Sequence, residues 1–377
     1  MALRVDIMRV LLSGGGSGGH IYPALAIAHG LMEADPQTDI LYVGTNHGLE
    51  RDLVPREHLP FRAIHARGLL VAGISGKIGG VMAAVRGLVD ALGVVRSFKP
   101  DVVVGTGGYV SGPVGLAATI LKVPLVIQEQ NAWPGLTNRS LAKRAQAVFV
   151  PFEEAVRRFP PKTPVIIAGN PVGRRGEGIS RKEARRRLGI DDGIQLLMVT
   201  GGSQGAQALN HLMLGLLDDI GGDEAVGLIW ATGTRYYDRV QKAVQDRFGE
   251  KLDGRRIQVV DYFYDIHTVY QASDLFVGRA GAMSLTECEA FALPAVLIPS
   301  PNVSEDHQTR NAEAIAQRGA GVLVAESDLT RRSHEILALL KDKERLALMG
   351  EQIARLFDAQ AVERITGTIQ RLAGGRP

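Results

Sequence analysis

Short apolar segments alternate with longer stretches of mixed polarity along almost the whole chain. The first half holds Arg9–Leu12, Asp39–Val43, Asp101–Val104, Pro124–Ile127, Ala147–Val150 and Val165–Ala168. The second half holds Gln195–Thr200, Gly227–Ala231, Ile257–Val260, Asp274–Val277, Ala295–Ile298 and Gly321–Val324. Strands that are apolar throughout and separated by helical stretches are typical of a parallel sheet with both faces covered. The pattern therefore predicts an α/β protein with two parallel sheets.

A polar, glycine-rich segment separates the two strand series. Gly169–Gly178 cannot continue a strand or a helix, and we interpret it as a linker. Ser180 and Glu183 have the spacing of a capping box and Gly189 is a suitable stop, so a helix should open the second half. We expect two domains, at 1–172 and 173–355, and a C-terminal helix at 356–377 that packs back on the first domain.

The composition is that of a soluble globular protein, with 377 residues of which 45% are hydrophobic and 22% are charged. A single cysteine excludes an internal disulfide and a cysteine-rich metal site. The net charge of +3 is too small to indicate nucleic acid, and we expect no such partner. Charges interrupt the N-terminal apolar residues, which predicts a strand rather than a signal peptide. The uncharged run Val102–Leu121 contains several glycines and Pro113, so we interpret it as strand, loop and helix rather than a membrane span.

The first strand runs into a loop with five glycines between residues 14 and 19. Gly14, Gly16 and Gly19 match the dinucleotide pattern G-x-G-x-x-G, but the second strand ends at Gly44-Thr45 without the acidic residue that would hold a ribose. The missing acidic residue argues against NAD binding. Glycines let backbone amides approach a phosphate, and the next helix presents its positive end, so we favour anion binding over a plain turn.

Three more glycine-rich loops follow strands, at 105–113, 200–206 and 278–287. The loop at 105–113 should share a crevice with the first loop, where Tyr109 either lines the wall or packs as a buried ring. Ser203 could donate a hydrogen bond to a phosphate oxygen. Ser284 and Glu287 are spaced as a capping box, but Glu287 could equally accept both hydroxyls of a ribose.

His20 ends the first loop and begins a helix, whose N-terminus disfavours the protonated imidazole. It could therefore act as a general base toward an alcohol, and its alternative role is helix capping or packing. The sequence has no Asp-x-Asp triplet, no His-Glu-x-x-His helix and no P-loop lysine motif. We expect no metal site and no cofactor.

Residues 66–99 combine basic and apolar positions at helical spacing. The basic residues are Arg67, Lys77, Arg86, Arg96 and Lys99, against the single acid Asp90. The apolar residues are Val81, Met82, Val85, Leu88, Val89 and Leu92. A basic amphipathic helix could lie on an anionic membrane surface, but a core-facing helix with a solvated basic side is the more common origin of such a pattern.

Seven segments resemble, in order, the motifs of the bacterial cell-wall glycosyltransferase family that converts lipid I into lipid II. They are GGGSGGHIYPALA at 14–26, GTGGYVSGP at 105–113, QEQNAWPGLTNR at 128–139, GNPV at 169–172, GGSQGA at 201–206, RAGAMSLTE at 279–287 and HQTRNA at 307–312. Together they span nearly the whole chain, and their combination is highly specific. That family transfers N-acetylglucosamine from UDP-N-acetylglucosamine (UDP-GlcNAc) to undecaprenyl-pyrophosphoryl-MurNAc-pentapeptide (lipid I).

The resemblance implies a GT-B fold, in which two Rossmann-like domains face a cleft, the first for the acceptor and membrane and the second for UDP-GlcNAc. It implies His20 as general base. The implied UDP-GlcNAc-binding residues are Ser17, Gly18, Gly19, Asn131, Arg174, Ser203, Tyr264, Ala282, Met283, Ser284, Glu287 and Gln308. The implied residues around the acceptor diphosphate are Gly14, Gly15, Gly16, Gly107, Gly108 and Tyr109.

Individual roles also follow from the resemblance. Glu287 would bind the ribose, and the backbone near Tyr264 would read uracil. Asn131 and Gln308 would hold the sugar. The family has an arginine directly after GNPV, where this chain has Gly173, so we interpret Arg174 as its substitute.

The resemblance further implies an inverting displacement by the MurNAc C4 hydroxyl, on a peripheral protein at the cytoplasmic face of the cell membrane. Two other enzymes with this fold remain as alternatives, a different lipid glycosyltransferase and a UDP-GlcNAc 2-epimerase. A non-catalytic nucleotide-sugar-binding protein is a further alternative, and an NAD-dependent dehydrogenase is the most distant one.

Overall fold

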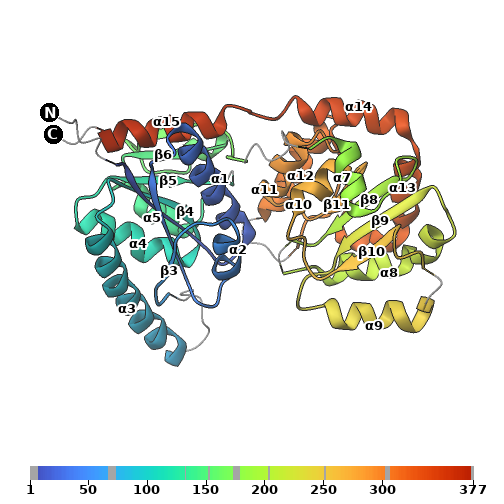
Figure 1. Cartoon of the computed structure of the whole chain (residues 1–377), viewed down its shortest axis with the longest axis horizontal. Coiled ribbons are helices and arrows are strands. Elements are labelled where there is room, and N and C mark those ends of the chain that lie inside the picture. Colours follow the sequence, from blue (N-terminus) through green and yellow to red (C-terminus); the bar gives the residue numbers. More distant parts are fainter. Residues whose placement is uncertain are drawn as a thin grey trace. The chain divides into compact units, whose positions relative to one another are not determined.

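The computed structural model describes residues 7–66, 74–131, 133–151, 153–172, 179–202, 204–249, 252–301 and 306–374. The chain divides into two compact units. Unit 1 comprises residues 1–173 and 358–377, and unit 2 comprises residues 174–357. Each unit is built around its own parallel sheet (Figure 1).

The sheet of unit 1 has seven parallel strands in the order β3-β2-β1-β4-β5-β6-β7. Its strands are β1 (Arg9–Gly14), β2 (Asp39–Gly44), β3 (Phe61–Ala63), β4 (Val102–Gly107), β5 (Leu125–Gln128), β6 (Ala147–Val150) and β7 (Val165–Ile167). The chain builds one edge outward from β1 and then the other edge from β4. The order of the strands thus reverses between β1 and β4, and α/β sheets bind ligands at the carboxyl ends of the strands beside such a point.

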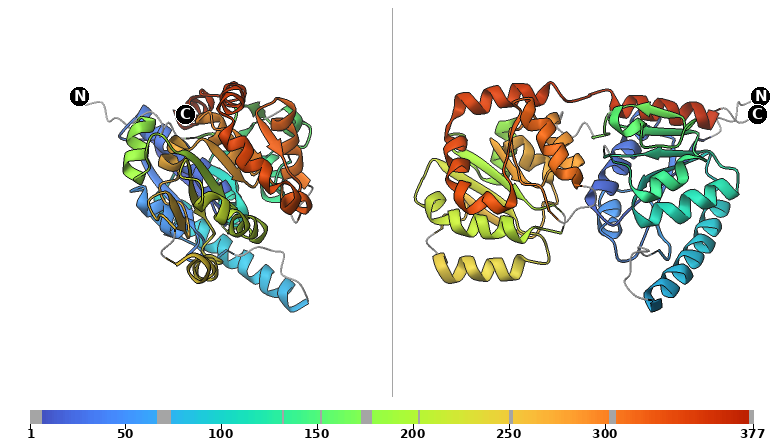
Figure 2. Two further views of the ribbon diagram at one scale, coloured as in Figure 1. Left: turned by 90° about the vertical axis from the view of Figure 1, so that its right-hand side faces the viewer. Right: turned by 180° about the vertical axis from the view of Figure 1, so that it is seen from behind.

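Helices cover both faces of this sheet. They are α1 (Gly18–Ala34), α2 (Glu50–Arg56), α3 (Ile74–Phe98), α4 (Gly108–Ile120), α5 (Leu136–Ala142), α6 (Glu153–Val156) and α15 (Ala361–Gly374). Buried residues of α3, α4 and α5 share one core, while α1 packs against α15 (Figures 1 and 2). A Cβ on Gly30 of α1 would come 2.3 Å from Val362 of α15, so glycine permits this close contact.

The sheet of unit 2 has six parallel strands in the order β10-β9-β8-β11-β12-β13. Its strands are β8 (Gln195–Thr200), β9 (Val226–Ala231), β10 (Ile257–Val260), β11 (Leu275–Gly278), β12 (Ala295–Leu297) and β13 (Gly321–Leu323). Its helices are α7 (Arg181–Leu188), α8 (Gln207–Gly221), α9 (Tyr237–Phe248), α10 (Ile266–Ala272), α11 (Ala282–Ala290), α12 (His307–Gln317), α13 (Leu329–Lys341) and α14 (Lys343–Ala354), with a short 3₁₀ turn at Glu326–Asp328. Leu197 and Val199 of β8 enter one core and Leu196 and Met198 enter another. The central strands β8, β9 and β11 are mostly apolar because both of their faces are buried, whereas the edge strands β10 and β13 are only partly buried.

The predicted fold class is confirmed in both sheets, with every predicted strand present. The sequence analysis missed β3, a three-residue edge strand that is only partly buried. Ser180 accepts the Glu183 amide at the start of α7, and Gly189 ends that helix in the left-handed conformation, as predicted. The second glycine loop is shorter than predicted, because β4 continues to Gly107 and α4 begins at Gly108.

No helix in the described ranges combines the length and the hydropathy needed to cross a bilayer. The run that we tested for this, Val102–Leu121, forms β4 and α4 as expected. The start of α3 projects from the rest of unit 1 (Figures 1 and 2). Val85 and Val89 of this helix are 59% and 62% exposed, whereas Val94 and Val95 are buried. Arg67 and the side chains of Lys77, Val81 and Met82 lie outside the described part of the chain.

Candidate active site

The two glycine-rich turns of unit 1 lie side by side because β1 and β4 are neighbouring strands. Gly14 pairs with Gly107 at the carboxyl ends of these strands. Gly108 has a φ of +78°, and a Cβ there would come 2.1 Å from the Gly15 carbonyl oxygen. Only glycine fits both the conformation and the space, so the glycine at this position lets the turns touch.

A buried carboxylate, Glu50 in the first turn of α2, fixes the first glycine turn. It accepts hydrogen bonds from the Gly16 amide (3.1 Å) and from the Thr45 amide (3.0 Å) and hydroxyl (2.7 Å). The Tyr109 ring packs over Gly16, where a Cβ would come 2.9 Å from it. The Gly16 amide is therefore engaged within the protein. The sequence analysis missed Glu50, because no local pattern links it to a loop 34 residues earlier.

The N-terminus of α1 presents two further amides at this turn. The helix begins at Gly18 after Ser17, whose side chain makes no capping hydrogen bond. Amides in the first turn of a helix have no acceptor within the helix, which applies to Gly18 and Gly19. Together with the positive end of the helix, these amides can bind an anion.

His20 follows in the same helical turn and reaches the end of β4. Its Nδ1 lies 3.1 Å from the Thr106 carbonyl oxygen and 3.1 Å from Oε1 of Gln130. The Thr106 hydroxyl donates to the His20 carbonyl oxygen (2.6 Å). A Cβ on Gly107 would come 2.8 Å from the imidazole, so this glycine makes room for the ring. The structure thus joins His20 to the second glycine turn through two residues, Thr106 and Gln130, that the sequence analysis did not assign.

Glu129 organises the loop that follows β5. One of its oxygens accepts the amide (2.9 Å) and the side chain (3.1 Å) of Asn131. The other accepts the Gly135 amide (3.0 Å) and the Asn138 side chain (2.9 Å). Two of these four hydrogen bonds hold Asn131, and the other two tie Glu129 to the following loop and to α5. The QEQN segment was recognised as a motif, but the role of Glu129 appears only in three dimensions.

In unit 2 the loops that follow β8 and β11 are neighbours, because Thr200 pairs with Gly278. Helix α11 begins at Ala282 after a glycine N-cap, which has no side chain to cap the helix. The amides of Ala282, Met283 and Ser284 therefore lack acceptors within the helix. They form an anion-binding end like that of α1.

Glu287 lies one turn further along α11 and is only 4% exposed. It forms no capping box, since Ser284 lies inside the helix, and that alternative is wrong. Burial raises the pKa of Glu287 to about 7, and the neighbouring Tyr270 hydroxyl partly opposes this shift. Nε2 of His267 lies 4.0 Å from a Glu287 oxygen, and the rings of His267 and Tyr270 both stack on Phe291. A buried carboxylate in such surroundings is suited to accept hydrogen bonds from a ligand.

The remaining residues predicted for the donor lie in several places. Tyr264 is 53% exposed in the loop after β10, and its hydroxyl donates to Asp261 (3.4 Å). Gln308 in α12 accepts the Ser300 amide (2.8 Å). Asn131 belongs to unit 1 and Gln308 to unit 2. Gly173, Arg174 and Ser203 lie outside the described residues.

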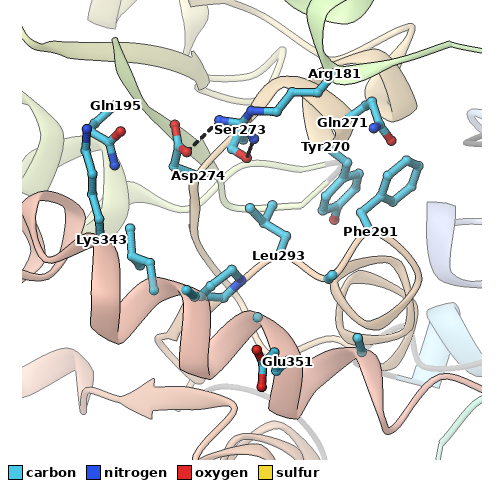
Figure 3. A pocket seen from close by; sticks show the side chains of 16 residues that line it. Arg181, Gln195, Tyr270, Gln271, Ser273, Asp274, Phe291, Leu293, Lys343 and Glu351 are labelled. Carbon is cyan, nitrogen blue, oxygen red and sulfur yellow. Dashed lines mark hydrogen bonds and ion pairs between the residues drawn. The ribbon is translucent and has the colours of Figure 1, made fainter. Parts of the chain in front are cut away.

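A groove of about 700 Å³ opens in unit 2 at the end of the strands opposite to the donor loops (Figure 3). Its lining includes Ser273 and Leu293, which come just before β11 and β12, so the groove lies at the amino ends of these strands. The predicted donor loops leave the carboxyl ends instead. Tyr270 and Phe291 line this groove, and Tyr270 also neighbours Glu287, so α10 borders both regions.

Comparison with known proteins identifies a family for both units. Residues 10–150 match the model of the glycosyltransferase family 28 N-terminal domain, and residues 196–365 match that of the glycosyltransferase family 28 C-terminal domain. The UDP-N-acetylglucosamine–N-acetylmuramyl-(pentapeptide) pyrophosphoryl-undecaprenol N-acetylglucosamine transferase of Desulforudis audaxviator is 42% identical over 369 residues, which cover 97% of this chain and 99% of the relative. The protein of the same name from Moorella thermoacetica is 42% identical over 364 residues, with 96% and 98% covered.

Solved structures agree with this assignment. Acinetobacter baumannii MurG superposes with a TM-score of 0.69 at 27% identity, covering 97% of this chain and 99% of that one. Staphylococcus aureus MnaA, solved with UDP, also has a TM-score of 0.69, but at 14% identity it shows the fold alone. From the two domain matches and the full-length relatives, the chain belongs to the family of UDP-N-acetylglucosamine–N-acetylmuramyl-(pentapeptide) pyrophosphoryl-undecaprenol N-acetylglucosamine transferases, within glycosyltransferase family 28.

Proposed function

We propose that this protein transfers N-acetylglucosamine from UDP-GlcNAc to the MurNAc C4 hydroxyl of lipid I, giving lipid II. The relatives carry this activity in their names. The observation in this chain that carries the proposal is the arrangement on α11, where three amides without acceptors in the helix are followed one turn later by the buried Glu287. Such a helix suits the phosphates and the ribose of one nucleoside diphosphate.

The donor would be held mainly by unit 2. The Ala282, Met283 and Ser284 amides would bind the UDP phosphates, with Ser203 assisting, while Glu287 accepts the ribose hydroxyls. The remaining donor contacts in the proposal are the backbone near Tyr264 for uracil, Arg174 for the nucleotide sugar, and Asn131, Gln308, Ser17, Gly18 and Gly19 for the GlcNAc ring. Fixed amides stabilise the negative charge that grows on departing UDP without reorganising.

The acceptor diphosphate would lie against the paired turns of unit 1, at Gly14, Gly15, Gly16, Gly107, Gly108 and Tyr109. Because the Gly16 amide already donates to Glu50, Gly16 would contribute its shape rather than a hydrogen bond. A buried carboxylate beneath a phosphate site would be repulsive if it were unsatisfied. Its three hydrogen bonds reduce this repulsion.

The reaction would be a single displacement with inversion. The C4 hydroxyl oxygen forms the new bond to the anomeric carbon while the bond to the UDP oxygen breaks. The hydroxyl proton passes to His20, and UDP leaves with the electron pair of the broken bond. General-base assistance of this kind contributes about 10²- to 10⁴-fold to a rate.

The membrane partner would be an anionic lipid surface at the cytoplasmic face, where the protein would bind peripherally. Val85 and Val89 are exposed on α3 next to Arg86, which provides apolar and basic groups on one helix. We expect the double variant V85S/V89S to bind phosphatidylglycerol vesicles less tightly than the unaltered protein in a sedimentation assay. Equal binding of the two proteins would contradict this docking surface.

One assay tests the reaction and its alternatives. Purified protein receives labelled UDP-GlcNAc and a lipid I analogue, with and without EDTA, and we expect a β-linked disaccharide lipid under both conditions. Epimerisation of UDP-GlcNAc without acceptor would indicate the 2-epimerase, and a preference for diacylglycerol would indicate another lipid glycosyltransferase. Binding of UDP-GlcNAc without any transfer would indicate a non-catalytic protein.

A further inference from the structure

We propose that Gln130 is a positioning residue that holds His20 in the Nδ1-protonated tautomer, so that Nε2 is the nitrogen that accepts the proton. This inference rests on the proposed role of His20 as general base. It is carried by the hydrogen bonds around the imidazole, all of which lie within unit 1.

The orientation of the Gln130 amide follows from its neighbours. Its Nε2 lies 2.8 Å from the Thr106 carbonyl oxygen and 3.2 Å from the Gln128 carbonyl oxygen. Carbonyl oxygens only accept hydrogen bonds, so the nitrogen of the amide must occupy this position. Oε1 of Gln130 therefore faces His20, at 3.1 Å from Nδ1.

The tautomer of His20 follows in turn. Nδ1 is 3.1 Å from the Thr106 carbonyl oxygen as well as 3.1 Å from Oε1 of Gln130, and neither atom can donate. Nδ1 must carry the proton to satisfy them. A neutral imidazole has only one N–H, so its lone pair is on Nε2.

Two more buried amides lock this arrangement. Gln130 Nε2 also donates to Oε1 of Gln128 (2.5 Å), and Nε2 of Gln128 donates to Oδ1 of Asn170 (3.2 Å). Asn170 in turn donates to the Gln130 carbonyl oxygen (3.1 Å), so the three residues form a closed set of hydrogen bonds. The exposed fractions of Gln128, Gln130 and Asn170 are only 0%, 2% and 5%. The QEQN and GNPV segments, far apart in the sequence, thus act together on His20.

This network of hydrogen-bonded amides suits a base that becomes charged during the reaction. When Nε2 takes the C4 hydroxyl proton, the imidazolium keeps its Nδ1–H hydrogen bonds to Gln130 and Thr106. Both acceptors are neutral dipoles that already point at the ring, so no group must rearrange as the charge forms. Gln130 thereby takes the orienting role that an aspartate has in a serine protease triad.

The first test measures the tautomer directly in the full-length protein. Nitrogen NMR of ¹⁵N-histidine-labelled protein distinguishes the two ring nitrogens, and the H20Q variant identifies the His20 signals by their loss. We expect the neutral ring to carry its proton on Nδ1. A proton on Nε2 would overturn the proposal, whatever any variant does.

The second test separates positioning from folding. We expect Q130M to lower kcat about 10- to 100-fold, as small misplacements of a reacting group do. We expect its UDP dissociation constant to be unchanged. Q146M is a matched control, since Gln146 in unit 1 accepts the Leu125 amide (2.6 Å) at the opposite end of the sheet, and it should keep its kcat.

The outcomes distinguish this inference from the proposed function. If H20Q loses turnover while Q130M keeps the normal kcat, the proposed base stands and the positioning role is overturned. If H20Q turns over normally, His20 is not the base, and the positioning role proposed for Gln130 is overturned as well. Loss of kcat in both H20Q and Q130M, with Q146M unaffected, supports the inference.

Discussion

The buried glutamates of the two candidate sites, Glu50 and Glu129 in unit 1 and Glu287 in unit 2, lie in contrasting surroundings, although the two sheets are wound alike. In unit 1, Glu129 accepts four hydrogen bonds and Glu50 accepts three, each fixing a loop. In unit 2, burial raises the pKa of Glu287 to about 7, and its neighbours are the aromatic side chains of α10. Unit 1 is therefore organised before any ligand arrives, whereas Glu287 gains most from a ligand that supplies donors. Two sites at the ends of similar strands can therefore differ: in one the carboxylates already hold the loops, and in the other the carboxylate is left to accept hydrogen bonds from a ligand.

The largest expected effect is on the chemistry in unit 1. We predict that H20A lowers kcat by about 10²- to 10⁴-fold, because it removes the general base. UDP affinity should be unchanged, because we assign UDP to unit 2. Single-turnover kinetics and calorimetry with UDP measure the two quantities separately. A parallel loss of UDP affinity would contradict the division of roles between the units.

The next largest effect is on UDP binding by the Glu287 carboxylate of unit 2. We predict that E287Q weakens UDP binding by about 10- to 100-fold, the range for losing a hydrogen bond to a charged group. The same change should weaken the binding of 2′-deoxy-UDP less, because that nucleotide offers Glu287 only the 3′ hydroxyl. E289Q, on the same helix, is the control and should bind UDP normally. An equal loss for both nucleotides in E287Q would argue against a contact with the ribose.

A smaller effect, on stability, tests whether unit 1 is organised by its carboxylates. We predict that E50Q lowers the free energy of unfolding by about 1–3 kcal/mol, because a glutamine leaves one buried N–H group facing another donor. Chemical denaturation followed by fluorescence measures the loss. E153Q is the control, since the Glu153 side chain is 76% exposed and should matter little. Unchanged stability of E50Q would show that the carboxylate does not hold the loop.

The smallest effect concerns the pH dependence of UDP binding. With its pKa at about 7, Glu287 of the free protein is mostly protonated at pH 6 and mostly ionised at pH 8. UDP needs the ionised form, so its apparent affinity should rise about ten-fold from pH 6 to pH 8. Calorimetry on the wild type and on E287Q isolates this contribution from the titration of UDP itself. The same pH dependence in both proteins would exclude Glu287 as its source.

The same raised pKa has an opposite consequence for folding. The folded state keeps a proton on Glu287 between its ordinary pKa of 4.5 and about 7, whereas the unfolded chain releases it. The contribution of Glu287 to stability is therefore most favourable at low pH and declines as the pH rises through this window.

The sequence predicted the sheets well because each strand carries its own signal, a short apolar run between polar or glycine residues. It predicted the glycine turns for a similar reason, since close backbone contacts exclude other residues. It missed β3, whose three residues are too few and too exposed to form a pattern. It also left Glu50, Thr106 and Gln130 unassigned, because their partners lie at sequence separations of 34, 86 and 110 residues.

By itself, then, the sequence determined the two parallel sheets, the positions of the strand-end loops and the family motifs, because these depend on local periodicity and on glycine. The tertiary structure decided which amides are already engaged, which histidine nitrogen carries the proton and which carboxylate has its pKa raised by burial. These properties depend on distances between segments that are far apart in the chain. A hydrogen bond needs both of its partners in place, and only folding brings them together.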